Sequence, residues 1–241
     1  MLYTSKENQK IKKLKKLNDK KYRHESGLFI IETEHLINEA YKNNLLEELI
    51  LLEGTNTDLD VPTSYVDYKV MKYITNLTTP SNMLGICKFK KESELGNKIL
   101  VLDGIQDPGN LGTIIRSAVA FNVDTIILGE NTVDLYNSKV LRASEGMIFN
   151  INIVNKKLTE FLPNIKKQGY KIIGTKLTDG KNIKTLEKNN KICIIMGNEG
   201  SGIQKDIFDL CDEYVYIDMN KSCESLNVSI ATSIILYELD K

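Results

Sequence analysis

The chain has 241 residues, of which 41% are hydrophobic and 27% are charged, with a formal net charge of zero at pH 7. This composition is typical of a globular protein of one large or two smaller domains, and it excludes disordered and fibrous classes. No apolar run approaches the roughly 20 residues that span a bilayer, and the first residues lack the apolar block of a secretory signal. We therefore expect a cytoplasmic protein without a membrane segment.

The charge is unevenly distributed along the chain. Residues 1–24 hold nine lysines and arginines against two acidic residues, a net charge of +7, so the remainder carries −7. A basic arm of this kind suits a polyanion such as nucleic acid, because each phosphate contact releases counterions. Ile11, Leu14 and Leu17 recur every three residues, so the arm can equally be a helix that docks one apolar stripe while its lysines face water.

The first part of the chain is predicted to be a small α/β unit. The predicted elements are a strand from Leu28 followed by an amphipathic helix, a strand over Leu46–Leu52, a loop over Glu53–Tyr65, a helix near Val70–Leu77 and a strand near Leu84–Phe89. The polar stretch at residues 90–98 is then the expected boundary between two domains.

Strands and helices alternate in the second part of the chain. The predicted strands are Ile99–Leu102, Thr125–Leu128, Ile151–Val154, Tyr170–Gly174, Lys191–Met196 and Tyr214–Ile217, and the predicted helices are Leu111–Phe121, Lys139–Ser144, Leu158–Gln168, Ile203–Leu210 and Leu226–Leu239. Such alternation favours a parallel sheet that is covered on both faces. Ligands in such sheets bind outside the carboxyl ends of the strands. We therefore expect the loops that follow the strands to converge on one cavity.

The first of these loops carries an unusual arginine. The chain has 29 lysines and only three arginines, which indicates that an arginine is used where its planar fork is needed. Arg116 lies in the segment Asp103–Phe121, and Asn110 lies in the same segment where a helix N-cap is predicted. The spacing leaves two roles open for Arg116: it faces an anionic substrate, or it pairs with a carboxylate such as Glu145.

Two further loops follow strands in the second part. Gly197–Ile203 reads GNEGSGI, and its glycines let backbone approach a ligand closely. It fits neither the P-loop nor the dinucleotide pattern, so a cofactor other than ATP or NAD is favoured. Glu199 in this loop can also simply interact with a helix dipole. In the third loop Ser225 and Asn227 stand at the start of a helix, where free N–H groups favour anions or carboxylates. A core helix with an ordinary N-cap would look similar.

Metal chemistry is not expected. The four cysteines show no C-x-x-C spacing, and only His24 and His35 are available beside them. We expect all four cysteines to be reduced thiols.

Together the three loops resemble the signature motifs of the SpoU (TrmH) family of RNA 2′-O-ribose methyltransferases, over roughly Lys98 to Lys241. Asn110 and Arg116 are similar to the family's N-x-x-x-x-x-R pattern, MGNEGSGI to its G-x-E-G-x-G loop and ESLNVSIA to its S-L-N-V-S block. The segment Val133–Phe149 resembles the family's connecting segment. Residues 1–95 resemble, more loosely, the ribosomal-protein-L30e-like domain that often precedes the catalytic domain.

The resemblance implies an α/β fold of two domains. Residues 1–95 would form a small L30e-like α/β domain that binds RNA together with the basic arm. Residues 96–241 would form the methyltransferase domain, a mostly parallel sheet with helices on both faces that ends in a trefoil knot. The resemblance further implies a homodimer and S-adenosylmethionine as cofactor.

The resemblance also implies two sets of site residues. The cofactor would contact Thr175, Met196, Gly197, Ile217, Met219 and Leu226. The catalytic pocket would consist of Asn110, Arg116, Glu199, Ser225 and Asn227. Lys221 departs from the family, which often has glycine there, and either alters the cofactor loop or reaches RNA phosphate.

In the implied reaction a ribose 2′-oxygen attacks the sulfonium methyl group, and no metal is needed. A guanidinium normally keeps its proton. Arg116 is therefore expected to orient the ribose or its phosphate and to stabilise negative charge on the 2′-oxygen, while a role as base would require it to lose that proton.

The expected substrate is 23S ribosomal RNA, by analogy with the front domain. Three alternatives stay open: a transfer RNA 2′-O-methyltransferase, a non-catalytic RNA-binding or ribosome-assembly protein with the same fold, and a nucleotide-dependent enzyme that uses GNEGSG as a phosphate loop.

Overall fold

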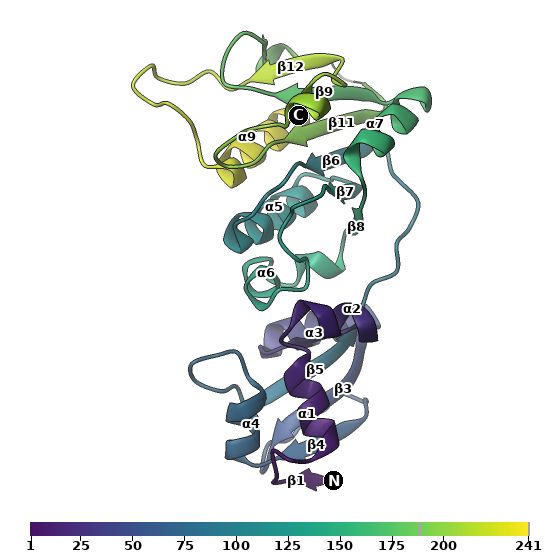
Figure 1. Ribbon diagram of the computed structural model, residues 1–241, viewed down its shortest axis with the longest axis vertical. Helices are drawn as coiled ribbons and strands as arrows, with labels where there is room; N and C mark the ends of the chain where they lie inside the picture. The colour runs from purple at the N-terminus through teal and green to yellow at the C-terminus, as the bar shows by residue number, and fades with distance from the viewer. Residues whose placement is uncertain (188, 241) are drawn as a thin grey trace. The chain divides into compact units, whose positions relative to one another are not determined.

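The computed structural model describes residues 1–187 and 189–240, so Lys241, the last residue of the second predicted domain, lies outside the described part (Figure 1). The chain forms two compact units. The first unit contains Met1–Lys91 and also Asp134–Phe149, and the second contains Glu92–Val133 and the residues from Asn150 on. All four cysteines are free thiols, as predicted.

The first unit is built on a five-stranded mixed sheet. Its elements are β1 (Leu2–Tyr3), α1 (Gln9–Lys16), α2 (Lys20–Ser26), β2 (Leu28–Ile31), α3 (Glu34–Lys42), β3 (Leu46–Leu52), β4 (Thr63–Val66), α4 (Tyr68–Ile74), β5 (Met83–Lys88), α6 (Ser138–Ala143) and a 3₁₀ turn at Met147–Phe149. The strand order is β1-β4-β3-β5-β2. β5 runs antiparallel to both β3 and β2, whereas β4 pairs in parallel with β1 and β3.

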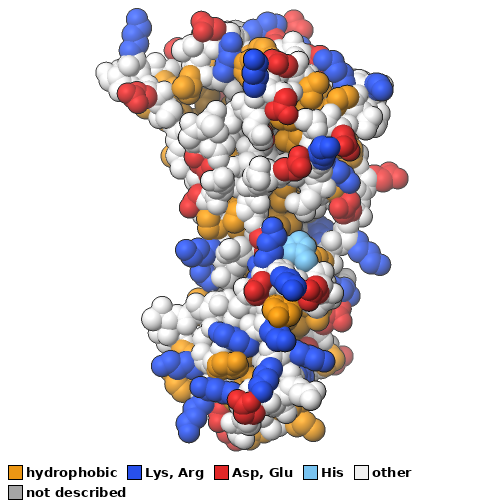
Figure 2. Space-filling view, viewed as in Figure 1, with side chains coloured by type: hydrophobic (Ala, Val, Ile, Leu, Met, Phe, Trp, Pro, Cys, Tyr) orange, Lys and Arg blue, Asp and Glu red, His pale blue; other side chains and the backbone are white. Residues whose placement is uncertain are grey.

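Within the basic arm, α1 and the residue that follows it dock one apolar stripe. Ile11, Leu14 and Leu17 are buried and pack in one core cluster with Val70 and Met71 of α4. The stripe predicted from the three-residue spacing is therefore confirmed. The lysines of α1 lie outside this core, and Figure 2 shows lysine and arginine side chains gathered over the part of the first unit that holds α1 and α4.

The loop predicted over Glu53–Tyr65 is partly wrong, because its last residues belong to β4. In β4 the buried side chains of Ser64 and Val66 alternate with the more exposed Thr63 and Tyr65. Only one of these four residues is a strongly apolar β-former, so no hydrophobic run marks the strand. Pairing with β3 on one side and β1 on the other defines it.

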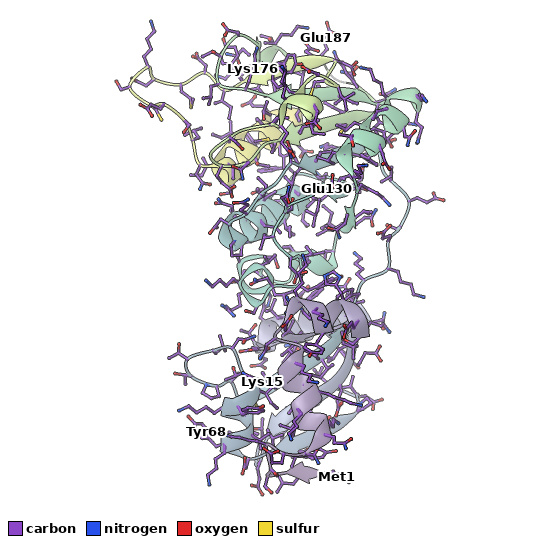
Figure 3. The ribbon with its side chains drawn as sticks, in the orientation of Figure 1. Met1, Lys15, Tyr68, Glu130, Lys176 and Glu187 are labelled. Atoms are coloured by element: carbon purple, nitrogen blue, oxygen red, sulfur yellow. The ribbon has the colours of Figure 1, made fainter. Side chains whose placement is uncertain are left out.

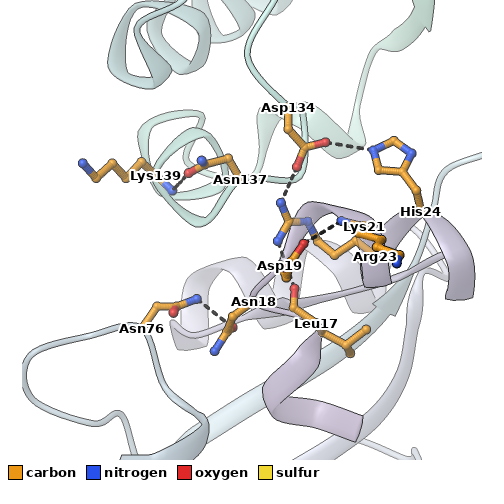
Figure 4. Close-up of polar contacts among 10 residues, drawn as sticks. All are labelled: Leu17, Asn18, Asp19, Lys21, Arg23, His24, Asn76, Asp134, Asn137 and Lys139. Carbon is orange, nitrogen blue, oxygen red and sulfur yellow. Dashed lines mark hydrogen bonds and ion pairs between the residues drawn. The ribbon is translucent and has the colours of Figure 1, made fainter.

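Residues 134–149 join the first unit through a buried ion pair. Asp134 accepts from the Arg23 guanidinium, and both side chains are almost fully buried (Figure 4). Arg23 also donates to the carbonyl oxygen of Leu17, and the second oxygen of Asp134 lies 3.1 Å from His24 Nε2. The carboxylate therefore ties this segment to α2, and Arg23 in turn ties α2 to the turn after α1.

An aromatic stack adds a second attachment. The ring of Tyr136 stacks on those of Phe29 and Phe89, with centroid distances of 4.5 and 4.1 Å, and the Phe29 and Phe89 centroids lie 6.1 Å apart. The Tyr136 hydroxyl accepts a hydrogen bond from the Lys90 backbone N–H at 3.1 Å. Stacked rings of this kind contribute more than the area that they bury, so the segment is packed as part of the core of the first unit.

The second unit is built on a seven-stranded parallel sheet. Its elements are β6 (Lys98–Leu102), α5 (Pro108–Ala120), β7 (Thr125–Leu128), β8 (Asn152–Asn155), α7 (Leu158–Lys167), β9 (Lys171–Thr175), β10 (Lys181–Asn182), a 3₁₀ turn at Ile183–Thr185, β11 (Ile192–Met196), α8 (Lys205–Phe208), β12 (Glu213–Tyr216) and α9 (Val228–Asp240). The strand order is β10-β12-β9-β11-β6-β7-β8, and every pair is parallel. The predicted α/β fold with a mostly parallel sheet is confirmed.

Both faces of the central strands of this sheet are buried. Along β6 the side chains of Ile99 and Val101 pack against α7, while Leu100 and Leu102, which point to the other face, are equally buried. Figure 1 shows α7 on one side of the sheet and α5 and α9 on the other. Polar chemistry is therefore confined to the strand ends.

Candidate active site

The candidate site lies at the carboxyl ends of the strands of the second unit. β6, β9, β11 and β12 are parallel neighbours, so their carboxyl ends lie at one edge of the sheet. Residues 103–107 follow β6, residues 197–204 follow β11 and residues 217–227 follow β12. These are the three loops that the sequence predicted to converge.

A series of side-chain hydrogen bonds joins the three loops. Asn227 Nδ2 donates to Asn110 Oδ1 at 3.0 Å, and Asn110 Nδ2 donates to Glu199 Oε1 at 3.0 Å. Asn227 Oδ1 accepts from the backbone N–H and the hydroxyl of Ser229, which caps α9. Because this capping fixes Oδ1 as the acceptor, the amide of Asn227 must present its nitrogen to Asn110. Each orientation in the series is therefore set by its neighbour.

Glu199 closes the series as an ionised carboxylate. Besides Asn110 it accepts from the backbone N–H groups of Gln106 and Asp107 at 3.3 and 3.2 Å, just before α5 begins, and from Asn198 Nδ2. Burial alone would raise the pKa of Glu199, but the hydrogen bonds from Asn110 and from backbone N–H groups outweigh it, so the pKa lies below its usual value. A carboxylate held in this way is an acceptor that fixes a turn, rather than a proton donor.

The N-cap predicted at Asn110 is wrong. α5 begins at Pro108, and its N-cap is Asp107, whose side chain accepts from the Asn110 backbone N–H at 2.8 Å. Proline is favoured at the first helical position because its missing N–H is not needed there, which moves the helix start ahead of the predicted Leu111. The side chain of Asn110 is thereby free to bridge Glu199 and Asn227.

A cavity of about 470 Å³ opens beside these loops. The predicted cofactor residues Thr175, Met196, Gly197, Ile217, Met219 and Leu226 all line it. The predicted catalytic residues Glu199, Ser225 and Asn227 line it as well, whereas Asn110 reaches it only through its hydrogen bonds to two of them.

Gly197 shows how tightly the second loop is folded. Asn198 and Gly202 exchange two backbone hydrogen bonds of 2.9 and 3.0 Å, which close the loop. A Cβ added at Gly197 would lie 2.2 Å from the backbone of Gly202 and Ile203. Only glycine fits there, so backbone rather than a side chain forms this part of the cavity wall.

Arg116 is not placed with the other predicted catalytic residues. It lies on α5 six residues beyond Asn110, about 9 Å further along the helix axis, and it does not line the cavity. It is exposed, and it forms no hydrogen bond or ion pair with any described residue of its unit. Glu145, the alternative partner, belongs to the first unit. Asn110, the first residue of the N-x-x-x-x-x-R motif, therefore lies at the site, whereas Arg116, the last residue, lies too far along α5 to line the cavity.

Two residues of the site were missed from the sequence. Asp103 is buried and accepts from the backbone and side-chain nitrogens of Gln204 at 2.7 and 2.6 Å, which ties the first loop to the second. Lys176 lines the cavity directly after β9. Both follow the last residue of a strand, and that position was the available signal. Lys221 lies in the exposed loop that follows β12.

Among residues 1–187 and 189–240, no helix is long and apolar enough to cross a membrane. The same residues contain no group of three or more histidine, cysteine or acidic side chains that is arranged to hold a metal ion.

Comparisons with known proteins identify the family. The model of the SpoU rRNA Methylase family matches residues 97–237, and that of the MRM3-like substrate binding domain matches residues 8–85. The 23S rRNA (guanosine(2553)-2′-O)-methyltransferase RlmP of Bacillus subtilis is 34% identical over 241 residues, which cover 98% of this chain and 97% of the relative.

Solved structures agree with this. The AdoMet-bound rRNA methyltransferase from Sinorhizobium meliloti has a TM-score of 0.87 and 27% identity, with 99% of this chain and 97% of that chain covered. The SpoU methyltransferase AviRb from Streptomyces viridochromogenes, in complex with AdoMet, has a TM-score of 0.85 over 97% of each chain and, at 21% identity, shares the fold. The resemblance drawn from the three loops is confirmed, and the chain belongs to the SpoU rRNA methylase family.

Proposed function

We propose that this protein methylates a ribose 2′-oxygen in 23S ribosomal RNA, with S-adenosylmethionine as the methyl donor. The observation that carries the proposal is the hydrogen-bonded series Asn227, Asn110 and Glu199, which holds three motif loops beside one cavity. The Bacillus subtilis relative is a 23S rRNA 2′-O-methyltransferase by name, and it supports both the reaction and the class of RNA.

The test is incubation with labelled S-adenosylmethionine and unmodified total RNA, followed by nuclease digestion and nucleoside mass analysis. We expect label in a 2′-O-methylated nucleoside from the large ribosomal RNA. Label on a base contradicts the proposal, and label in transfer RNA corrects the substrate. RNA binding without label would identify a non-catalytic RNA-binding or assembly protein.

The cavity fits the cofactor. Its volume of about 470 Å³ falls within the roughly 300–1,000 Å³ of small-molecule sites, and its wall combines apolar side chains with a few polar groups. The residues that would hold the cofactor are Thr175, Met196, Gly197, Ile217, Met219 and Leu226. When bound, S-adenosylmethionine supplies an electrophilic methyl group, and the proposal includes no metal.

The residues of the chain then have to position a ribose and manage the proton of its 2′-hydroxyl. Asn110 and Glu199 hold the turn before α5, and Ser225 and Asn227 shape the cavity wall beside it. Arg116 orients the ribose or its phosphate and stabilises negative charge on the 2′-oxygen, a role that its exposed guanidinium leaves open to RNA.

We propose that the protein works as a homodimer. Ile230 and Tyr237 lie seven residues apart on one face of α9 and are 52% and 51% exposed, which leaves an apolar strip uncovered. α9 packs against α5, which carries Arg116: the Ser117 and Ser233 hydroxyls lie 2.7 Å apart. A second copy seated on this strip would lie beside Arg116, so the arginine of one copy would serve the cavity of the other.

Mixed dimers test this arrangement. Arg116→Ala and Gly197→Val should each inactivate the homodimer, the first by removing the guanidinium and the second by filling the loop. Co-refolded mixtures should regain activity if Arg116 acts across the dimer. A monomeric mass by light scattering, or no recovery on mixing, would contradict it.

The proposal assigns RNA binding to the residues predicted as the first domain, 1–95, and methyl transfer to 96–241. The match of residues 8–85 to a substrate binding domain supports the first assignment, as does the lysine-rich outer face of α1. An L30e-like fold for the first domain, a trefoil knot in the second and a cytoplasmic location complete the proposal. They are supported by the family match, by the fold of solved relatives and by the ribosomal substrate of the Bacillus subtilis relative.

A further inference from the structure

One residue of the cavity wall carries a positive charge. Lys176 is the one lysine or arginine among the described residues that line it. It follows Thr175, the last residue of β9, and its backbone N–H donates to the carbonyl oxygen of Val215 in β12 at 3.0 Å. This hydrogen bond fixes the start of the side chain at the sheet edge where the other site loops lie.

Two stacked aromatic rings hold the ammonium group. Lys176 Nζ lies 5.0 Å from the centroid of the Tyr214 ring and 5.9 Å from that of Phe208. The two rings stack at 4.1 Å, and the Tyr214 hydroxyl donates to the Phe208 carbonyl oxygen at 2.8 Å. A cation over an aromatic face is attracted to it without being neutralised. The two rings, which do not themselves line the cavity, therefore hold the ammonium group without neutralising it. Lys176 is labelled in Figure 3.

No carboxylate among the described residues pairs with Lys176. The one acidic residue that lines the cavity is Glu199, and its oxygens accept hydrogen bonds from Asn110 and from the turn before α5. The side chain of Lys176 is also half-buried, which makes an unpaired charge more costly than it is in water. An anionic group of a ligand would provide the missing partner.

We propose that Lys176 binds an anionic oxygen group of a ligand in this cavity. The proposal rests on the proposed function, which supplies two sources of that chemistry: the carboxylate of S-adenosylmethionine and a phosphate of the RNA. Lysine suits both, because it acts as a compact point charge on a flexible stem.

Calorimetry with three ligands tests the carboxylate. S-adenosylmethionine and S-adenosylhomocysteine carry the carboxylate, whereas 5′-methylthioadenosine lacks it. Lys176→Met should weaken the binding of S-adenosylmethionine and S-adenosylhomocysteine by about tenfold, which corresponds to about 1.4 kcal/mol. The affinity for 5′-methylthioadenosine should not change. Lys176→Arg keeps the charge and should stay within about threefold of wild type for all three.

The RNA arm of the experiment tests the phosphate. If all three small ligands bind Lys176→Met as they bind wild type, RNA binding should instead weaken, and the slope of log affinity against log salt should fall by roughly 0.7–0.9. That result assigns the anion to RNA. Unchanged affinity for the small ligands together with an unchanged salt slope overturns the proposal.

Lys191→Met is the matched control. Lys191 Nζ also lies over a tyrosine ring, 5.1 Å from the centroid of Tyr170, but Lys191 does not line the cavity. Its removal should change neither binding series. If Lys176→Met lowers the thermal midpoint of unfolding, a second variant is needed. Tyr214→Leu keeps the lysine but removes one of the two rings that hold its ammonium group, and it should lower the affinity for the same ligands by a smaller factor. Failure of wild type to bind S-adenosylmethionine contradicts the proposed function, whereas wild-type binding without any effect at Lys176 contradicts only this inference.

Discussion

The motif loops of the second unit and the outer face of α1 differ in how their polar groups are satisfied. In the loops, Asn110, Glu199 and Asn227 are joined to one another and to backbone N–H groups by hydrogen bonds of 2.9–3.3 Å. On α1, Lys13 and Lys16 form no ion pair with any described residue. The hydrogen bonds in the loops fix the positions of the polar side chains, which catalysis requires. The unpaired lysines on α1 leave a positive surface that attracts a polyanion. Changes in the loops should therefore alter turnover, and changes on α1 should alter affinity and its salt dependence.

The largest effect is expected at Arg116, which belongs to the motif but not to the hydrogen-bonded series. Arg116→Ala, and also Arg116→Lys, should lower methyl transfer by at least about 10²–10³-fold, the range for removing one group that stabilises developing charge. S-adenosylmethionine should bind normally, because Arg116 does not line the cavity. Labelled methyl transfer and calorimetry measure the two quantities.

Thr113→Ala is the matched control for Arg116, since Thr113 is exposed one turn earlier on α5. It should leave both methyl transfer and cofactor binding as in wild type. Wild-type turnover in either Arg116 variant would refute the assignment.

The next largest effect is expected at Asn110, which links the two other members of the series. Asn110→Ala should lower kcat by about 10–100-fold through misplacement of the loops and should cost about 1 kcal/mol of unfolding free energy. Asn137→Ala removes the cap of α6, where Asn137 Oδ1 accepts from the Lys139 N–H at 2.9 Å, at a similar cost of about 1 kcal/mol. Equal kcat losses in the two variants would show that stability, not the series, matters.

A smaller and different effect is expected on α1. Replacing Lys12, Lys13, Lys15 and Lys16 together by glutamine should weaken RNA binding. The slope of log affinity against log salt should fall by up to about 0.9 for each phosphate that the helix no longer neutralises. Both kcat and the affinity for the cofactor should stay as in wild type. Filter binding over a salt series measures this. Replacing Lys156, Lys157, Lys166 and Lys167, four lysines at and beside α7, should change the salt slope less. If the salt slope of the α1 variant equals that of wild type, the lysines of α1 do not contact RNA phosphates and simply face water.

The smallest effect is expected from the charge of Glu199. Because its folded-state pKa lies below the ordinary 4.5, its contribution to stability is present above that value and is lost as pH falls through the lowered pKa. Glu199→Gln should therefore reduce the acid dependence of the unfolding free energy between pH 6 and pH 3. The difference should stay below about 1 kcal/mol, because the side chain is exposed to solvent. Urea unfolding at several pH values measures it, and parallel pH profiles for the two proteins would contradict the account.

The parallel sheet could be predicted because its strands are continuous apolar runs. Thr125–Leu128, for example, was predicted with the bounds that β7 has. In the mixed sheet of the first unit, Leu46–Leu52 was predicted with the bounds of β3. β4 could not be predicted, because its residues alternate in burial and are organised by pairing with β3. A short apolar run bounded by turn residues marks a buried strand, whereas the four residues of β4 contain no such run.

The candidate site could be predicted only in part. The glycine-rich loop and the residues before α9 stood out by composition, and they line the cavity. Arg116 lies outside the cavity because it is six residues beyond Asn110 on α5, about 9 Å along the helix axis. The sequence also placed the start of α5 too late. Lys176 was missed because its one signal is its position directly after a strand, and its residue type does not distinguish it among 29 lysines. Its environment comes from Phe208 and Tyr214, which are distant in sequence.

The attachment of residues 134–149 to the first unit limits how the protein can be divided. The chain leaves that unit after Lys91, returns at Asp134 and leaves again after Phe149. A fragment that starts near residue 96 would keep Asp134 and Tyr136 but lose Arg23, Phe29 and Phe89, their partners. Such a truncation would expose a buried carboxylate and unstacked aromatic rings, and we expect it to aggregate. Separate expression of the catalytic half should therefore require surface redesign of this insertion.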